Sequence, residues 1–419
     1  MNQMFNPNSQ SLNDWLSYLE SIHPQEIEMG LNRVRQVALT LNLLTELNHV
    51  ILVGGTNGKG STSAYLERLI LASGATTGVF SSPHLINYNE RLRINGLELA
   101  DDDHIEAFRV IEKARSDIAL TYFEVNTLSA LFLMKKYDVD YLILEVGLGG
   151  RLDSTNIVDA NMAVITSIDL DHQSWLGTTR EEVAYEKAGI FRKSQQVICG
   201  EPNPPQPLLD KAIELNCKTL FKGQEFSFND NNECWSFEYA NTRYDNLPIT
   251  KLPMTNAATA LAAFTQLGLK LSEKDIINVI RETSLNGRLQ KISNSPAVYL
   301  DVAHNPEAGR YLAAWIARQK ASKVHAVCAM LGDKDSASTL AVLKPYVNQW
   351  YIAGLDIPRG ASSIELSQSL QVSSAQLFNQ VTDALGTAIT NVQSSECCEQ
   401  ELIIVFGSFF TVAQVLESK

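Results

Sequence analysis

The run of small and polar residues from Gly54 to Ser61, Gly-Gly-Thr-Asn-Gly-Lys-Gly-Ser, has the composition of a phosphate-binding turn. It follows the apolar segment His49–Val53, and a helical pattern begins near Gly60. In such a strand–turn–helix unit, backbone N–H groups and the helix N-terminus attract phosphate oxygens. Lys59 would then reach the terminal phosphates, and the Ser61 hydroxyl would ligate Mg²⁺. The structural alternative is a tight turn with an exposed lysine.

The run departs from the common phosphate loop G-x-x-x-x-G-K-[ST] in two ways. Three residues rather than four separate Gly54 from Gly58, and Gly60 stands between Lys59 and Ser61. The run is therefore a variant of the common phosphate loop rather than an exact match to it.

Alternating strand and helix patterns are expected to position this turn. Several apolar segments are apolar on both faces, which is typical of a parallel sheet covered on each side. We expect strands at His49–Val53, Thr77–Phe80, Tyr141–Val146, Met162–Ile168 and Gln196–Cys199, and helices at Ser61–Ala72, Val125–Tyr137, Glu181–Phe191 and Thr255–Leu267. The polar segment Glu225–Pro248 is expected to form short antiparallel strands. The fold class is therefore α/β with a mostly parallel sheet.

A chain of 419 residues is too long for one compact core, so two or three domains are expected. A second series of strands is predicted at Val298–Val302, Val324–Met330, Gln349–Ala353 and Leu402–Phe406. The polar stretch Asn286–Pro296 contains Gly and Pro, so we place a linker at 289–297. This divides the chain into a phosphate-loop domain at 1–288 and a smaller α/β Rossmann-like domain at 298–419.

Composition excludes several classes of protein. A formal charge of −13 argues against nucleic-acid binding, which requires a basic face. The polar segment Met1–Trp15 does not have the pattern of a signal peptide, and no apolar run approaches the length of a membrane span. The six cysteines include no C-x-x-C pair, which favours reduced thiols in a cytoplasmic protein.

Three further residues could act with the turn. Glu145 ends an apolar strand, at the sheet edge where ligands bind in doubly wound folds, and a buried carboxylate there would suit Mg²⁺. His172 follows another strand by a few residues, and Lys187 lies on a predicted helix. From the residues alone, an exposed strand-end glutamate, a polar loop histidine and a solvated surface lysine are the alternative readings.

The glycine-rich run resembles that of the Mur ligase superfamily, whose members join amino acids to carboxylates using ATP. Further motifs resemble its folylpolyglutamate synthase and dihydrofolate synthase branch. They occur in the expected order over almost the whole chain: Ser81-Ser82-Pro83-His84-Leu85, Leu144–Asp153, Asp171-His172, Glu186-Lys187-Ala188-Gly189-Ile190 and Asp301-Val302-Ala303-His304-Asn305-Pro306.

The resemblance implies a set of ligands and site residues. It implies two Mg²⁺ ions, held by Ser82, Glu145, His172 and a carbamate formed from CO₂ on Lys187. The catalytic residues implied are Lys59, His172 and Lys187. The ATP site implied comprises Thr56, Asn57, Gly58, Lys59, Gly60, Ser61, Asn256, Arg288 and Asp301.

The resemblance also implies the reaction. ATP phosphorylates a pteroate or folate carboxylate, and the amino group of L-glutamate attacks the acyl phosphate, so dihydropteroate, reduced folates and L-glutamate are the expected substrates. Thr121, Tyr122, Phe123, Glu124, Leu152 and Asp153 are expected to bind the pteroate part. His304 and Ser408 are candidates for the glutamate site. From composition alone, Tyr122 and Phe123 could equally anchor a helix in the core. The family expectation is a monomer.

The sequence has three alternative interpretations. A peptidoglycan-type Mur ligase carries an additional domain before the loop, for which the 53 residues before Gly54 are too few. A non-catalytic nucleotide-binding module would have no chemical need for Lys59, Glu145, His172 and Lys187 together. A folylpolyglutamate synthase without dihydrofolate synthase activity stays open, although the segment His23–Val34, with Gly30 and Arg33, resembles the bifunctional bacterial type.

Overall fold

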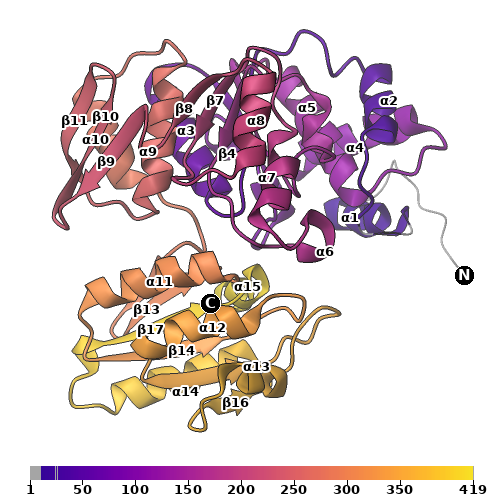
Figure 1. Ribbon diagram of the computed structural model, residues 1–419. Coiled ribbons are helices and arrows are strands. Elements are labelled where there is room, and N and C mark those ends of the chain that lie inside the picture. Colours follow the sequence, from indigo (N-terminus) through magenta and orange to yellow (C-terminus); the bar gives the residue numbers. More distant parts are fainter. Residues whose placement is uncertain (1–10, 24, 26, 419) are drawn as a thin grey trace, which may run out of the picture. The chain divides into compact units, whose positions relative to one another are not determined.

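The computed structural model describes residues 11–418 except 24 and 26, and the chain forms two compact units. The first unit runs to Thr283 and the second begins at Ser284. Each has its own sheet and its own apolar core (Figure 1).

The first unit is built on an eight-stranded sheet in which β1 lies in the interior, between β5 and β6. Six neighbouring strands from β2 to β8 run parallel, and β3 and β4 add an antiparallel edge. In sheet order the strands are β4 (Leu97–Glu98), β3 (Leu92–Ile94), β2 (Thr77–Phe80), β5 (Tyr141–Glu145), β1 (His49–Gly54), β6 (Met162–Ile165), β7 (Gln196–Cys199) and β8 (Lys218–Phe221).

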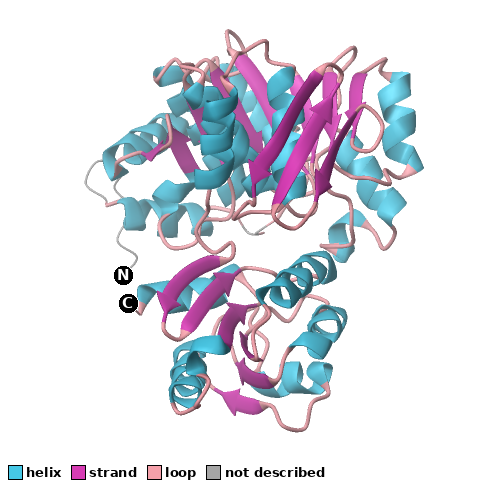
Figure 2. Cartoon of the chain, turned by 90° about the vertical axis from the view of Figure 1, so that its left-hand side faces the viewer, coloured by secondary structure: helices cyan, strands magenta, loops and turns pink. Residues whose placement is uncertain are grey.

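Helices cover both faces of this sheet (Figure 2), which explains why its central strands are apolar on both sides. The helices of the first unit are α1 (Leu12–Ser21), α2 (Asn32–Thr40), α3 (Lys59–Ala72), α4 (Asp101–Arg115), α5 (Tyr122–Lys136), α6 (Gln173–Leu176), α7 (Arg180–Ala188), α8 (Gln206–Glu214), α9 (Met254–Thr265) and α10 (Glu273–Glu282), with the 3₁₀ turns η1 (Tyr88–Arg91) and η2 (Ser154–Ile157). Helices α3 and α9, far apart in the sequence, pack against each other.

A small antiparallel sheet forms the margin of the first unit. Its strands are β9 (Phe226–Asp230), β10 (Cys234–Tyr239) and β11 (Thr242–Pro248), with β10 in the centre. Rings of Phe226, Trp235 and Phe237 are buried on it. The antiparallel strands predicted for Glu225–Pro248 are therefore confirmed.

The second unit has a six-stranded sheet that is parallel except for its first strand. In sheet order the strands are β12 (Gln290–Asn294), β13 (Ala297–Asp301), β17 (Glu401–Phe406), β14 (Lys323–Cys328), β15 (Gln349–Ala353) and β16 (Gln376–Phe378). The helices are α11 (Pro306–Gln319), α12 (Ser336–Leu343), α13 (Ser363–Leu370), α14 (Val381–Gln393) and α15 (Phe409–Glu417), with η3 (Lys344–Tyr346) and η4 (Cys398–Gln400).

The segment expected as a linker, 289–297, is instead part of the second sheet. Strand β12 pairs antiparallel with β13, with Gln290 opposite Leu300 and Asn294 opposite Ala297. The polar side chains that suggested a linker belong to an edge strand, of which no residue is fully buried. The α/β fold class itself, a mostly parallel sheet followed by a smaller α/β unit, is confirmed.

Candidate functional site

The glycine-rich turn joins β1 to α3, and its conformation requires glycine at two positions. Gly55 has φ 151° and Gly58 has φ 85°. A Cβ atom on Gly58 would lie 2.6 Å from Oδ1 of Asn256, the third residue of α9. The turn and this asparagine, two separate parts of the predicted ATP site, are therefore in contact. The side chain of Asn256 is buried against the loop rather than exposed as a simple helix cap.

The segment after β6 holds the turn in place through hydrogen bonds. The backbone N–H of Thr56 donates to the Ser167 carbonyl (2.9 Å), and the Thr56 hydroxyl donates to the Asp169 carbonyl (2.8 Å). The Thr166 hydroxyl donates to the Asn57 carbonyl (2.6 Å). The Lys59 ammonium lies over the turn and donates to the carbonyl oxygens of Gly55 (3.0 Å) and Thr56 (3.1 Å). Gly60 and Ser61 continue into the first turn of α3, where Ser61 is buried.

Ser82 and Glu145 meet at the carboxyl edge of the same sheet. The backbone N–H of Ser82 lies 3.4 Å from Oε2 of Glu145, a residue that is only 5% exposed. Glu145 ends β5, which lies directly beside β1. Two members of the predicted metal shell are thus adjacent: Glu145 ends β5, the strand beside β1, and Ser82 follows β2, the next strand along.

Lys187 is buried in the last turn of α7, with 3% of its surface exposed. The glycine-rich loop after β5 packs on this helix: a Cβ atom on Gly150 would lie 2.8 Å from the Glu186 carbonyl oxygen and 3.2 Å from Cα of Lys187. The Arg151 guanidinium binds the Glu186 carboxylate (2.8 Å). Lys187 is therefore not a solvated surface lysine. The motif Leu144–Asp153 packs against the motif that begins at Glu186.

His172 precedes α6 in a left-handed conformation, with φ 50°, and its side chain is exposed. Across the part of the chain that is described, no group of three or more His, Cys, Asp and Glu side chains is arranged to hold a metal ion. The predicted shell contains two side chains of these types, Glu145 and His172; its other members are Ser82 and the carbamate on Lys187.

Several residues predicted to bind the pteroate part also hold the local backbone. The Thr121 hydroxyl accepts from the Glu124 N–H (3.3 Å), while Glu124 accepts from the Thr121 N–H (2.8 Å), which forms a capping box at the start of α5. The Glu124 carboxylate also binds the Arg33 guanidinium (2.9 Å). Asp153 is buried, and its carboxylate accepts from the N–H groups of Leu148 (2.8 Å) and Thr155 (3.0 Å). Burial nevertheless raises the pKa of Asp153 above its ordinary value.

The aromatic residues of this region, Tyr122 and Phe123, are half-buried and pack against the apolar core of the first unit. The Phe123 ring stacks on Phe80 with centroids 5.7 Å apart, and Leu152, also half-buried, lies in the loop after β5. The Tyr122 ring lies 5.4 Å from the Arg91 guanidinium. The Nε of Arg91 donates to Nδ1 of His84 (2.8 Å), and burial, with the Arg91 charge, lowers the pKa of His84 to about 4.

A second set of polar residues gathers at the carboxyl edge of the second sheet, where β13 and β17 end side by side. Asp301 is buried, and its two oxygens accept from the N–H groups of Leu289 (2.9 Å) and Ala303 (2.8 Å). Burial raises the pKa of Asp301, and the charge of Arg288 opposes the shift. The Arg288 guanidinium lies 5.0 Å from the centroid of the Phe409 ring.

The two glutamate-site candidates lie at this same edge. Nδ1 of His304 is 2.8 Å from the Val302 carbonyl oxygen, and its ring centroid is 6.4 Å from that of Phe409. Ser408 caps α15 by accepting from the Thr411 N–H (3.0 Å). The second unit therefore brings Arg288, Asp301, His304 and Ser408 into one region.

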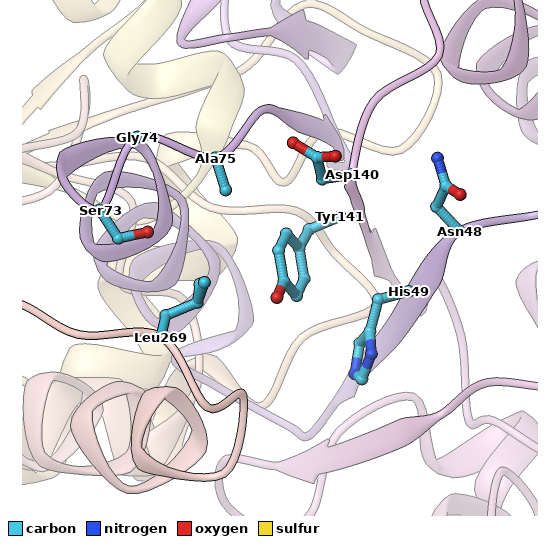
Figure 3. A pocket seen from close by; sticks show the side chains of 8 residues that line it. All are labelled: Asn48, His49, Ser73, Gly74, Ala75, Asp140, Tyr141 and Leu269. Carbon is cyan, nitrogen blue, oxygen red and sulfur yellow. The ribbon is translucent and has the colours of Figure 1, made fainter.

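A hollow of about 560 Å³ lies at the opposite, amino-terminal edge of the first sheet (Figure 3). It is lined by Asn48, His49, Ser73, Gly74, Ala75, Asp140, Tyr141 and Leu269, with Tyr141 projecting between His49 and Leu269. None of the predicted site residues lines it. The glycine-rich turn and the Ser82–Glu145 contact lie at the other edge.

Comparisons with known proteins agree with this arrangement. Residues 53–245 match the Mur ligase middle domain, and residues 287–409 match the Mur ligase glutamate ligase domain. The chain is 47% identical to the dihydrofolate synthase/folylpolyglutamate synthase of Escherichia coli (strain K12), over 97% of this chain and 95% of that protein. The chain belongs to the dihydrofolate synthase/folylpolyglutamate synthase family. Its members are Mur-type ATP-dependent ligases, so the enzyme class predicted from the motifs is confirmed.

Solved structures of this family share the fold over the whole chain. E. coli FolC in complex with DHPP and ADP has a TM-score of 0.94 at 46% identity, covering 99% of each chain. A bifunctional folylpolyglutamate synthase/dihydrofolate synthase with Mn, AMPPNP and L-glutamate bound has a TM-score of 0.92 at 46% identity, again covering 99% of each chain.

Sequence reasoning missed two features of the site region. One is the Arg33–Glu124 ion pair, which joins the first turn of α2 to the start of α5. The other is the part-buried contact between Arg91 and His84, although His84 belongs to one of the recognised motifs. No local pattern signals either contact, because each depends on which loops meet at the sheet edge.

Proposed function

We propose that this protein ligates L-glutamate to dihydropteroate, giving dihydrofolate, and to the γ-carboxyl of folates, with ATP converted to ADP and phosphate. The observation that carries the proposal is the placement of the phosphate turn beside the Ser82–Glu145 contact, at one edge of one sheet. The family to which the chain belongs supports the substrates. A folylpolyglutamate synthase without dihydrofolate synthase activity is the second candidate.

The phosphate turn fits ATP. Its glycines carry no side chain that would block the approach of a phosphate, and α3 directs its positive end toward the turn. We assign Thr56, Asn57, Gly58, Lys59, Gly60 and Ser61 to the phosphates, with Asn256 beside them. In the proposed reaction the Lys59 ammonium exchanges its contacts with the loop carbonyls for phosphate oxygens, and so offsets negative charge on the transferred group.

The residues around Glu145 fit divalent metal. Its carboxylate is nearly buried, the Ser82 backbone lies against it, and hard oxygen ligands are what Mg²⁺ prefers. Ser82, Glu145, His172 and a carbamate on Lys187 would hold Mg²⁺, two ions in the full proposal. When bound, the metal would neutralise charge on the phosphoryl group during transfer.

Burial of Lys187 supports the carbamate. Removal from water favours the neutral amine, and only the neutral amine attacks CO₂. A bond then forms between Nζ and the carbon of CO₂, and the nitrogen releases a proton to solvent. The result replaces a cation that would repel Mg²⁺ with an anionic oxygen ligand.

The substrate side of the proposal uses both units. The pteroate residues are Thr121, Tyr122, Phe123, Glu124, Leu152 and Asp153, where half-buried Phe123 offers a ring face and Thr121 and Asp153 shape the loops. In the second unit we assign Arg288 and Asp301 to ATP, and His304 and Ser408 to L-glutamate. The chemistry is acyl transfer: the substrate carboxylate takes a phosphoryl group from ATP, the glutamate amine attacks that carbonyl, and phosphate leaves.

The first test is ADP release by the purified protein. Release that requires both L-glutamate and either dihydropteroate or tetrahydrofolate is expected. Turnover of ATP that ignored both substrates would make the protein a nucleotidase or regulatory module. Activity with tetrahydrofolate but no product from dihydropteroate would reduce the function to folylpolyglutamate synthesis.

The carbamate has its own test. Lys187→Ala is expected to lose most activity, on the order of 10²-fold or more, and acetate or formate in the buffer should restore part of it. Full activity of the unrescued variant would remove the carbamate from the mechanism. Light scattering after size exclusion tests the monomer that the proposal includes.

The proposal places the enzyme in the cytoplasm, where the six free cysteines would remain reduced. Among the described residues, no helix is long and apolar enough to cross a membrane.

A further inference from the structure

Arg91, the last residue of η1, is a buried cation with an unusual environment. Only 8% of its surface is exposed. Its Nε donates to His84, and the Tyr122 and Tyr88 ring centroids lie 5.4 and 6.0 Å from its guanidinium carbon. Among the residues that the structure describes, none accepts a hydrogen bond from Nη1 or Nη2, and none forms an ion pair with Arg91.

Other arginines of the first unit with largely buried side chains are paired with carboxylates. Arg33 binds Glu124 at 2.9 Å, Arg93 binds Glu67 at 2.8 Å, and Arg115 binds Glu112 at 2.6 Å. A buried guanidinium is costly without an anion. Ring faces attract the charge of Arg91 but offer no acceptor in the plane of its N–H groups. Nη1 and Nη2 therefore lack the anionic acceptor that a buried guanidinium needs.

The position of Arg91 links it to the proposed active site. The Arg91 carbonyl accepts from the Ser81 N–H (2.9 Å), and the next residue, Ser82, lies against Glu145. On the other side, Tyr122 directly follows Thr121 at the start of α5. Arg91 thus lies between the loop assigned to metal and the helix start assigned to the pteroate part, all within the first unit.

We propose that Arg91 binds a carboxylate of the reacting substrates and contributes to substrate specificity. A planar guanidinium matches a carboxylate with two parallel hydrogen bonds, and the ligand would supply the anion that the protein omits. The inference rests on the proposed function. The carboxylate is either that of the pteroate or folate, or one of those of L-glutamate.

The test compares Arg91→Lys with Arg93→Lys. Lysine keeps the charge but loses the fork, and at position 93 it can still pair with Glu67. In Arg91→Lys, KM for one carboxylate substrate is expected to rise at least tenfold, while KM for ATP stays within twofold of wild type. All KM values of Arg93→Lys should stay within twofold. The substrate whose KM rises identifies the carboxylate.

Direct binding separates this inference from the proposed function. Calorimetric titration of tetrahydrofolate and of L-glutamate into the protein with AMPPNP is expected to give a Kd at least tenfold higher for Arg91→Lys than for wild type, for one of the two. This comparison holds even if turnover proves absent, which would sink the ligase proposal alone. Unchanged KM and Kd values in Arg91→Lys, in a variant whose thermal unfolding matches wild type, would overturn the role of Arg91. A variant that does not fold would overturn it as well, since the residue would then be structural.

Discussion

The carboxyl edges of the two parallel sheets carry polar residues that are held in opposite ways. In the first unit, glycines and the hydroxyls of Thr56 and Thr166 shape the phosphate loop, and the Lys59 side chain rests on the finished turn. In the second unit, side chains build the loops: Asp301 receives two backbone N–H groups and Ser408 caps a helix.

This difference predicts which substitutions reduce activity alone and which also reduce stability. A side chain that rests on a loop can be removed without unfolding the loop, whereas a side chain that holds the backbone cannot. We therefore expect loss of the Lys59 side chain at the first edge to reduce activity alone, and loss of the Ser408 side chain at the second edge to reduce activity and stability together.

The largest effect is expected for Lys59→Ala. Activity should fall by roughly 10²- to 10³-fold, because charge on the transferred phosphoryl group is no longer offset. The free energy of unfolding should change by less than about 0.5 kcal/mol, as for other substitutions away from core features. Steady-state kinetics and urea unfolding measure the two quantities. A large loss of stability would contradict the distinction between the two edges.

Gly58→Ala should act through the shape of the first loop. Alanine would have to adopt φ 85°, and its Cβ would clash with the Asn256 amide. We expect KM for ATP to rise about tenfold or more, since about 1–2 kcal/mol of backbone strain adds to the displaced amide. Gly74→Ala is the matched control, because Gly74 has φ 89° and open space around it. Equal effects of both variants on KM would show that the contact with Asn256 is irrelevant.

Ser408→Ala tests the second edge. Loss of the helix cap should cost about 1 kcal/mol, and we expect KM for L-glutamate to rise several-fold. Ser362→Ala removes a comparable cap from α13, where Ser362 accepts from the Glu365 N–H. This control should lose stability but keep its KM. Were Ser408→Ala to lower activity with no loss of stability, the second edge would resemble the first.

The smallest effect concerns the cores. In the second unit, buried His325 lies 2.8 Å from the Glu401 carboxylate. In the first, His104 is buried and neither ring nitrogen has a partner among the described residues. Burial lowers the pKa of His104 from 6.5 to about 4.

Because the unfolded state binds a proton first, the contribution of His104 to stability falls as the pH drops from 6.5 toward 4. When the pH is lowered from 7.5 to 5.5, the free energy of unfolding of His104→Leu should therefore rise by about 1 kcal/mol relative to that of wild type. Urea unfolding at the two values measures this gain. An equal stability difference at both pH values would refute it.

The sequence predicts best what depends on local pattern. Strands β2 and β7 have the predicted bounds, because short apolar segments between turns define them. Strand β12 was mistaken for a linker because an edge strand that is polar and only partly buried carries no apolar pattern. Edge strands β3 and β4 were missed for a similar reason: β3 is only three residues long and β4 is exposed.

The site shows the same limit. The glycine-rich turn and the strand-end glutamate could be located from sequence, since both follow apolar segments. The contact of Gly58 with Asn256 and the burial of Arg91 could not, because they depend on which distant loops meet. The left-handed backbone at His172 also has no local signal in the sequence.

The contact between Gly58 and Asn256 has a consequence for biosynthesis. The turn leaves the ribosome long before α9, and at about 5–20 residues per second the interval is roughly ten to forty seconds. During that time the phosphate loop lacks the Asn256 side chain, which contacts Gly58 in the folded protein. The nascent chain therefore completes the proposed nucleotide site late, when nearly all of the first unit has been made.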